Sequence, residues 1–159
     1  MIRIGVSACL MGKNVRYDGN NKFIELSEFF NANHYKLVAI CPEVEMGMPI
    51  PRPPIHIINN NQIKLLQVND HNIDYTKGMK SWFIDNYDKF NQYKGFILKS
   101  KSPSCGHQTT PHFQTNEFFL ADGLFVSLLK KQNPNIALID EKQICNSLTL
   151  TNFIQNIAN

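Results

Sequence analysis

The segment KSKSPSCG, Lys99–Gly106, follows directly on the apolar run GFIL and brings Cys105 to the end of a loop. Two other apolar runs end in the same way, because IRIGVSAC ends on Cys9 and YKLVAIC ends on Cys41. Runs of this length and composition are typical of buried strands. Since the carboxyl ends of parallel strands meet at one edge of a sheet, we expect the three thiols to lie together there. Such a group could bind one metal centre.

The composition is that of a globular protein. A length of 159 residues predicts a single domain over 1–159, which is long enough to bury a core without disulfides. Hydrophobic residues make up 43% of the chain and charged residues 18%, which excludes a disordered protein. The net charge of +3 comes without a concentrated basic stripe, so nucleic-acid binding is not favoured. The apolar runs are far shorter than a membrane span.

The first residues, MIRIGVSAC, resemble a strand and lack the apolar region and the cleavage site of a secretory signal. We therefore expect a cytoplasmic protein. In a reducing compartment, the four cysteines favour thiol chemistry or metal binding over a disulfide framework. Burial as a structural thiol is the alternative for each cysteine considered singly.

Predicted strands and helices alternate along the chain. The strands are expected at 2–7, 36–40, 95–98 and 136–140, and the helices at 23–33, 74–93, 123–132 and 141–157. This order predicts an α/β fold, a single Rossmann-like domain with a mostly parallel sheet flanked by helices. Between the strand expected at 36–40 and the helix expected at 74–93, the segment IHIINNNQIKLLQV predicts two short strands around Asn59–Asn61, which form a small hairpin at the margin of the sheet.

Two segments are predicted to be irregular. PEVEMGMPIPRPP, which follows Cys41, contains five prolines that each remove a backbone donor, so neither a helix nor a central strand is expected there. The segment 106–122 has poor periodicity and is predicted to be an active-site loop or lid. Its two histidines, His107 and His112, are expected to support the site and not to bind the metal.

Cys9, Cys41 and Cys105 are the candidate ligands, whereas Cys145 lies beside Ile144 in a predicted helix and is expected to pack against the core. Thiolates are the usual ligands of zinc and of iron–sulfur clusters. Three thiolates bind three irons of a four-iron cluster and leave the fourth iron free to take water or substrate. Zinc is the competing occupant, although the wide gaps between the cysteines exclude the close C-x-x-C pair that is common at zinc sites.

Polar residues near the cysteines are candidates for the chemistry. Glu43 lies two residues after Cys41 and is a candidate general acid or base. An ammonium and three hydroxyl groups precede Cys105: Lys99, Ser100, Ser102 and Ser104. None of these serines has an evident Ser-His-Asp partner, so hydrogen bonding or proton relay suits them better than a role as nucleophile.

Four segments together resemble the thiouracil desulfidase family (TudS-like proteins): VSACLMGKNVRYDG, CPEVEMGMPIPRPP, LKSKSPSCG and the ADG before the helix at 123–132. The resemblance spans most of the chain in the same order. It implies an α/β domain that holds an oxygen-sensitive 4Fe-4S cluster on three cysteines and removes sulfur from thiolated uracil without net redox change. The chain departs from the family at CPEVEMGMP, where many members carry a glycine pair before the proline.

The resemblance also implies roles for individual residues. Cys9, Cys41 and Cys105 match the ligands, Glu43 matches the catalytic glutamate, and Ser102 is our choice for the catalytic serine. The remaining candidates for substrate binding are Ser104, Ser100, Lys99, Arg16 and Asp18. The implied substrate is a small thiolated base or nucleoside whose thione sulfur binds the open iron, with no membrane or obligate nucleic-acid partner.

Two other functions remain open at this point. A zinc-dependent hydrolase would use the same thiolates together with a metal-activated hydroxide. A redox sensor or sulfur carrier would use a cluster or a persulfide as its signal, without turnover.

Overall fold

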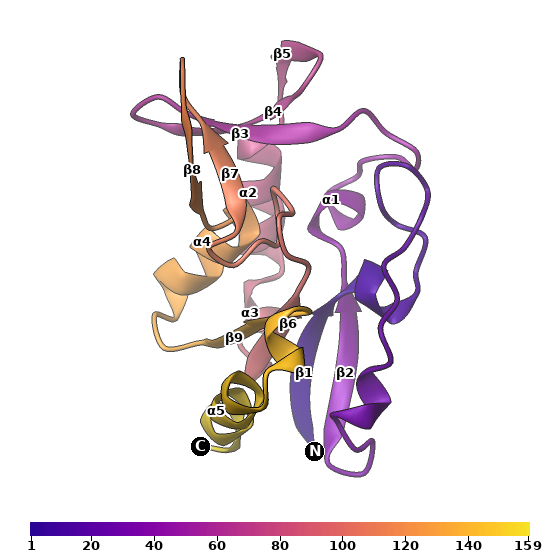
Figure 1. Cartoon of the computed structure of the whole chain (residues 1–159). Coiled ribbons are helices and arrows are strands. Elements are labelled where there is room, and N and C mark those ends of the chain that lie inside the picture. The colour runs from indigo at the N-terminus through magenta and orange to yellow at the C-terminus, as the bar shows by residue number, and fades with distance from the viewer.

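The computed structural model describes residues 1–159 and contains two sheets (Figure 1). Sheet A has four strands in the order β2-β1-β6-β9, which are Tyr35–Ile40, Ile2–Ser7, Gly95–Leu98 and Ala137–Asp140. All of its neighbouring strands run parallel. The predicted α/β fold with a parallel sheet is therefore confirmed.

The strand order of sheet A creates a ligand crevice. Strand β1 lies between β2 and β6, so the connections that leave β1 and β6 diverge at the carboxyl edge of the sheet. Open α/β sheets bind ligands at such a switch point. The residues that follow β1, β2 and β6 therefore share one edge, as the sequence predicts.

Sheet B has five strands in the order β5-β4-β3-β7-β8, which are Asp70–Asp74, Ile63–Gln67, Ile55–Asn59, Thr110–Phe113 and Phe118–Ala121. The predicted hairpin of β3 and β4 is confirmed, but it belongs to a larger second sheet that the sequence analysis missed. The prediction of an active-site loop over 106–122 is wrong. Strand β7 pairs in parallel with β3, a long-range contact that leaves no mark on local periodicity.

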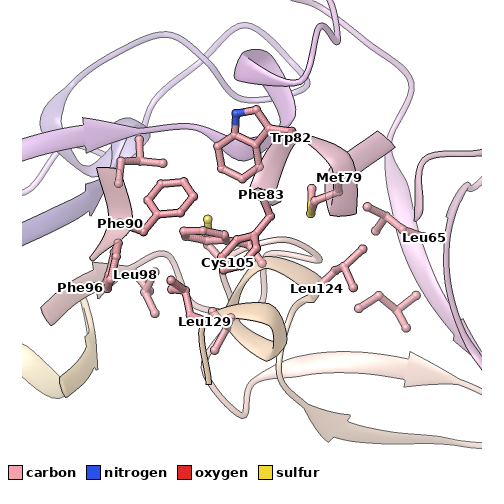
Figure 2. Packing of buried hydrophobic residues seen from close by; sticks show 14 of the residues in the cluster. Leu65, Met79, Trp82, Phe83, Phe90, Phe96, Leu98, Cys105, Leu124 and Leu129 are labelled. Atoms are coloured by element: carbon pink, nitrogen blue, oxygen red, sulfur yellow. The ribbon is translucent and has the colours of Figure 1, made fainter. Parts of the chain in front are cut away.

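The core covers both faces of sheet A. Phe96 and Leu98 of β6 belong to one cluster of buried residues, and Ile97 between them belongs to a second cluster on the opposite face. The first cluster contains the aromatic residues of helices α2 (Thr76–Asp85) and α3 (Tyr87–Phe90), as predicted, and also residues of sheet B (Figure 2). The two sheets therefore share one core.

Two of the predicted helices differ from the prediction and a third agrees with it. The helix expected over 74–93 is interrupted at Asn86, whose side-chain amide donates to the carbonyl of Trp82 at 2.9 Å. Helix α4 is confirmed at Leu124–Gln132. Helix α5 begins only at Ser147 and ends at Ala158, because Asn146 accepts the first backbone N–H groups and a 3₁₀ turn, η3 (Gln143–Cys145), precedes it. None of these helices has the length and apolar character needed to span a membrane.

Two segments near the crevice contradict the sequence prediction. The helix expected over 23–33 is reduced to one 3₁₀ turn, η2 (Leu26–Glu28), because the Ile24 N–H donates to the carbonyl of Leu10 and so ties the chain to the turn η1 (Ala8–Met11). Conversely, a short helix α1 (Pro42–Glu45) begins in the proline-rich segment. Proline is tolerated at the first helical position, where its missing donor would be unpaired.

Candidate active site

A pocket of about 290 Å³ lies at the carboxyl edge of sheet A. Cys9 of η1, Cys41 directly after β2 and Cys105 after β6 all line it. None of them forms a disulfide. The structure thus brings the three predicted cysteines to one pocket, whereas Cys145 is exposed and does not line it, contrary to its predicted core position.

The loop that carries Cys105 is held by helix α4. The backbone N–H of Leu124 donates to the carbonyl of Pro103 at 2.9 Å, and that of Phe125 donates to the carbonyl of Ser104 at 3.0 Å. At Gly123 a Cβ atom would lie 2.6 Å from the carbonyl oxygen of Ser104, so only glycine allows this approach. Cys105 itself lies among the aromatic and aliphatic side chains of the core cluster (Figure 2).

Burial controls the titration of the three thiols. It raises the pKa of Cys9, although the charges of Arg16 and Lys99 oppose it. Burial raises the pKa of Cys41 to about 11, and it raises the pKa of Cys105 well above the usual thiol range. Buried thiolates need a compensating positive charge, which a bound metal centre supplies.

The kind of donor bears on the kind of metal centre. No three side chains of His, Cys, Asp or Glu are arranged to hold a single metal ion. The lining of the pocket contains three cysteine thiols and no histidine. Thiolates are the usual ligands of iron–sulfur clusters, so this donor set suits such a cluster.

Glu43 of α1 lines the same pocket, and two groups hold its carboxylate. Its Oε1 accepts from Nε of Arg52 at 3.1 Å, and its Oε2 accepts from the hydroxyl of Ser104 at 2.8 Å. Arg52 also donates to the carbonyls of Val15 and Pro49, and its side chain is 3% exposed. The carboxylate therefore has a defined orientation at the pocket wall.

The three serines of the loop have different partners. The Ser102 oxygen accepts from the N–H groups of Ser104 and Cys105 at 3.2 and 3.0 Å, and its own hydrogen has no acceptor in the protein. Ser102 lines the pocket, whereas Ser104 is 0% exposed and does not. Ser100 is buried, and its hydroxyl donates to Glu141 at 2.7 Å. Ser102 is therefore the serine whose hydroxyl hydrogen is free to serve the pocket.

Of the other residues predicted to bind substrate, Arg16 and Lys99 line the pocket and Asp18 does not. The Nε atom of Arg16 is buried without a hydrogen-bond partner. Asp18 does not line the pocket, because it is exposed in a turn and its carboxylate accepts the N–H of Asn20 at 3.0 Å. Further polar residues that line the pocket and were not predicted include Tyr17, Lys22 and Lys101.

The histidines expected to support the site lie outside the pocket. His112 is buried in β7, where its Nε2 faces the carbonyl of Asp122 at 2.8 Å and must donate to it. Its Nδ1 then accepts from the side-chain amide of Asn59 at 3.2 Å. His112 joins sheet B to the start of α4 and takes no part in lining the site.

Sequence reasoning missed two residues that organise the site. Ser7 is the last residue of β1, and Glu141 is the first residue after β9. The rule that identified the cysteines, a polar side chain at the carboxyl end of a buried strand, would have identified both. They were passed over because a lone serine or glutamate is common at such positions and carries no metal-ligand signal.

The fold and the pocket define an α/β protein whose ligand crevice is lined by free thiols and a fixed carboxylate. The profile of the 2-thiouracil desulfurase family matches residues 4–141. The chain therefore belongs to this family, as the sequence motifs indicated.

The chain is also similar to two individual proteins. A protein of Bacillus subtilis (strain 168), the uncharacterized protein YbbK, is 31% identical over 110 residues, which cover 64% of this chain and 71% of the relative. The solved structure of the [4Fe-4S]-dependent thiouracil desulfidase TudS superposes with a TM-score of 0.70 and 27% identity, covering 95% of this chain and 99% of that one.

Proposed function

We propose that this protein is a thiouracil desulfidase, which converts a thiolated uracil and water into uracil and hydrogen sulfide. In this proposal Cys9, Cys41 and Cys105 bind a 4Fe-4S cluster. The observation that carries the proposal is the convergence of these three cysteines and Glu43 on one pocket, in a chain of the 2-thiouracil desulfurase family.

The donor set and the volume suit a cluster. Thiolates are soft ligands that favour iron–sulfur centres. The pocket of about 290 Å³ has room for about ten water molecules, far more than one ion needs. A cluster bound through three cysteines would leave one iron without a protein ligand, and that iron would supply Lewis-acid chemistry toward a sulfur atom of the substrate.

Glu43 is proposed as the base that removes a proton from the attacking water. A carboxylate has about four lone-pair sites, so the bonds from Arg52 and Ser104 leave room for a water molecule. Because both bonds restrict rotation of the carboxylate, the water would be held in one direction. Arg52 and Ser104 therefore act through Glu43 and need not touch the substrate.

Ser102 is proposed as the hydrogen-bond donor to the substrate. Two backbone N–H groups fix its oxygen, and its unshared hydrogen is available for the charge that develops on the ring during attack. The proton that Glu43 removes from the water would return to the departing sulfur, which leaves as hydrogen sulfide. A role for Ser104 in binding substrate is not favoured, because its hydroxyl already donates to Glu43.

The proposed substrate is a free thiolated base or nucleoside. The pocket of about 290 Å³ lies just below the usual range for ligand sites, about 300–1,000 Å³, and it would hold the cluster as well, so the remaining space suits a substrate no larger than a small heterocycle. Apolar side chains of Ile40, Pro54 and Ile55 offer a surface against which a flat ring can pack.

Anaerobic reconstitution with iron and sulfide, followed by an assay against 4-thiouracil, 2-thiouracil and their nucleosides, tests the proposal. We expect a brown protein that releases sulfide and the oxygenated base in equal amounts. A colourless zinc protein with the same activity would support the hydrolase alternative. A brown protein without turnover on any of these compounds would support the sensor.

A further inference from the structure

Glu141 lies beside the loop that carries Cys105 but does not line the pocket. The last paired residues of β6 and β9 are Leu98 and Asp140, so Lys99 and Glu141 extend two neighbouring strands beyond their final pair. Glu141 is therefore placed to act on the start of the loop from the adjacent strand.

Its carboxylate accepts three hydrogen bonds from two consecutive loop residues. Oε1 accepts from Nζ of Lys99 at 2.6 Å and from the hydroxyl of Ser100 at 2.7 Å, and Oε2 accepts from the N–H of Ser100 at 2.8 Å. The Lys99 and Glu141 side chains are 15% and 13% exposed. Burial opposes ionisation, but the bonds from Lys99 and Ser100 prevail and lower the pKa of Glu141.

The donors of Lys99 are all bound by other groups of the protein, although Lys99 and Ser100 line the pocket. Its Nζ also donates to the carbonyl and the hydroxyl of Ser100 at 2.9 and 3.3 Å, so its three N–H groups all have partners. Its backbone N–H donates to the hydroxyl of Ser7 at the end of β1. The charged groups of Lys99 and Glu141 therefore hold the loop in place.

The loop is held at both ends. Glu141 fixes Lys99 and Ser100 at its start, and the N–H groups of α4 bind the carbonyls of Pro103 and Ser104 near its end. Ser102 and Cys105 lie on the segment whose course these two attachments define. Loss of either attachment should disturb both residues.

We propose that Glu141 is a positioning residue, which acts through Lys99 and Ser100 to fix the loop that presents Ser102 and Cys105. In this arrangement Lys99 and Ser100 are structural partners of Glu141 and do not bind substrate. The expected effect on kcat rests on the proposed function. The expected effect on the structure of the loop does not.

The first test is the substitution Glu141→Gln, which keeps the shape of the side chain but removes the ion pair and leaves the Lys99 ammonium partly buried without a counter-charge. Residues that orient metal ligands typically contribute about 10- to 100-fold to activity or metal affinity. We expect kcat of the reconstituted enzyme to fall by that factor with KM unchanged, and the cluster to be lost faster in air.

The substitution Lys99→Met tests whether the losses in Glu141→Gln arise through Lys99 or from a general loss of structure. If Glu141 acts through Lys99, the double variant Glu141→Gln/Lys99→Met should recover part of the activity and stability lost in Glu141→Gln, because the unpaired charge is removed. The double variant also covers the case in which Glu141→Gln alone folds poorly. Strictly additive losses would contradict the coupling.

Asp122→Asn is the matched control. Asp122 likewise binds one lysine, Nζ of Lys130 at 2.7 Å, and one backbone N–H, that of Gln108 at 2.8 Å, but it does not line the pocket. We expect this variant to lose stability without a change in kcat or in cluster retention. Equal losses in Asp122→Asn and Glu141→Gln would mean a merely structural contribution and would overturn the proposal.

Amide hydrogen exchange of the cluster-free protein supplies a test that needs neither turnover nor a cluster. We expect Glu141→Gln to speed exchange over 99–105 and Asp122→Asn to leave that segment unchanged. If the wild type proved inactive, faster exchange in Glu141→Gln would still support the positioning role. Unchanged exchange, or a higher KM with unchanged kcat, would overturn it.

Discussion

The strands of the two sheets differ in how deeply they are buried. In sheet A, all four residues of β6 are buried, and polar residues gather where its strands end. In sheet B, all five residues of β5 are exposed, and Phe118, Phe119 and Leu120 of β8 lie largely at the surface. The inner strands β3 and β4 of sheet B nevertheless supply fully buried side chains to the shared core, such as Ile57 and Leu65.

This difference in burial explains why the candidate active site lies at the edge of sheet A. Parallel strands that are covered on both faces end at one edge, and the side chains beyond them are fixed by a rigid support. The carboxylates there have partners from other segments of the chain, as Glu43 has in Arg52 and Glu141 has in Lys99. Sheet B contributes Ile55 to the pocket wall and other side chains to the shared core, but its outer strands β5 and β8 are largely exposed, so substitutions there should matter little.

The largest expected contrast concerns the cysteines. Cys9→Ala, Cys41→Ala and Cys105→Ala should each abolish cluster binding and activity, because each removes one of three proposed ligands. Cys145→Ala should keep both, since its thiol is exposed outside the pocket. Iron and sulfide analysis after anaerobic reconstitution measures the difference. A cluster lost from Cys145→Ala alone would refute the ligand assignment.

The second contrast compares two glutamates. Glu43→Gln should lower kcat by about 10²- to 10⁴-fold, the usual contribution of a general acid or base, and keep the cluster spectrum. Thiouracil should still perturb that spectrum, because binding does not require the base. Glu117→Gln, in the exposed turn between β7 and β8, should behave as wild type. Stopped-flow absorbance and product analysis separate binding from turnover; wild-type turnover in Glu43→Gln would remove Glu43 from the mechanism.

The third contrast concerns stability. Arg52→Met leaves the Glu43 carboxylate and two backbone carbonyls without their donor in a nearly buried position. Breaking one side of a buried ion pair typically costs about 3–5 kcal/mol of unfolding free energy. Lys64→Met, at an exposed position of β4, should change it by less than about 0.5 kcal/mol. Urea unfolding measures both, and equal values would show that the edge of sheet A is no more tightly built than sheet B.

The smallest expected effect is a pH dependence within sheet B. The Nε2 atoms of His56 and His71 lie 2.9 Å apart, and burial together with the charge of His71 lowers the pKa of His56. Its folded pKa then lies below the unfolded value of about 6.5, so the unfolded chain binds the proton first as the pH falls. This contribution to stability is present above that unfolded value and is lost as the pH falls through the folded pKa.

Urea midpoints at about pH 7.5 and pH 5.5 test this sign, since those values bracket the unfolded pKa of histidine. We expect a lower midpoint in acid for the wild type and a smaller decrease for His56→Asn. The difference should be well below that of Arg52→Met, because His56 is only half-buried and His71 is exposed. An identical decrease in both proteins would show that His56 does not contribute.

Local patterns in the sequence were sufficient for the strands of sheet A and for the meeting of Cys9, Cys41 and Cys105 at its edge. Buried strands carry their signal in consecutive apolar residues, and parallel pairing brings their carboxyl ends together whatever the details of the loops. The proximity of Glu43 to Cys41 follows from their spacing along the chain. The expectation of one domain over 1–159 remains a prediction.

Contacts between distant segments were decided only by the tertiary structure. The predicted helix over 23–33 is lost to backbone bonds with η1, and β7 exists because β3 lies beside it. Likewise, Ser100, Ser102 and Ser104 are equivalent in sequence and differ only because Glu141, backbone amides and Glu43 bind them. The energy of a hydrogen bond depends on a partner that the chain brings from elsewhere, so no local pattern can assign it.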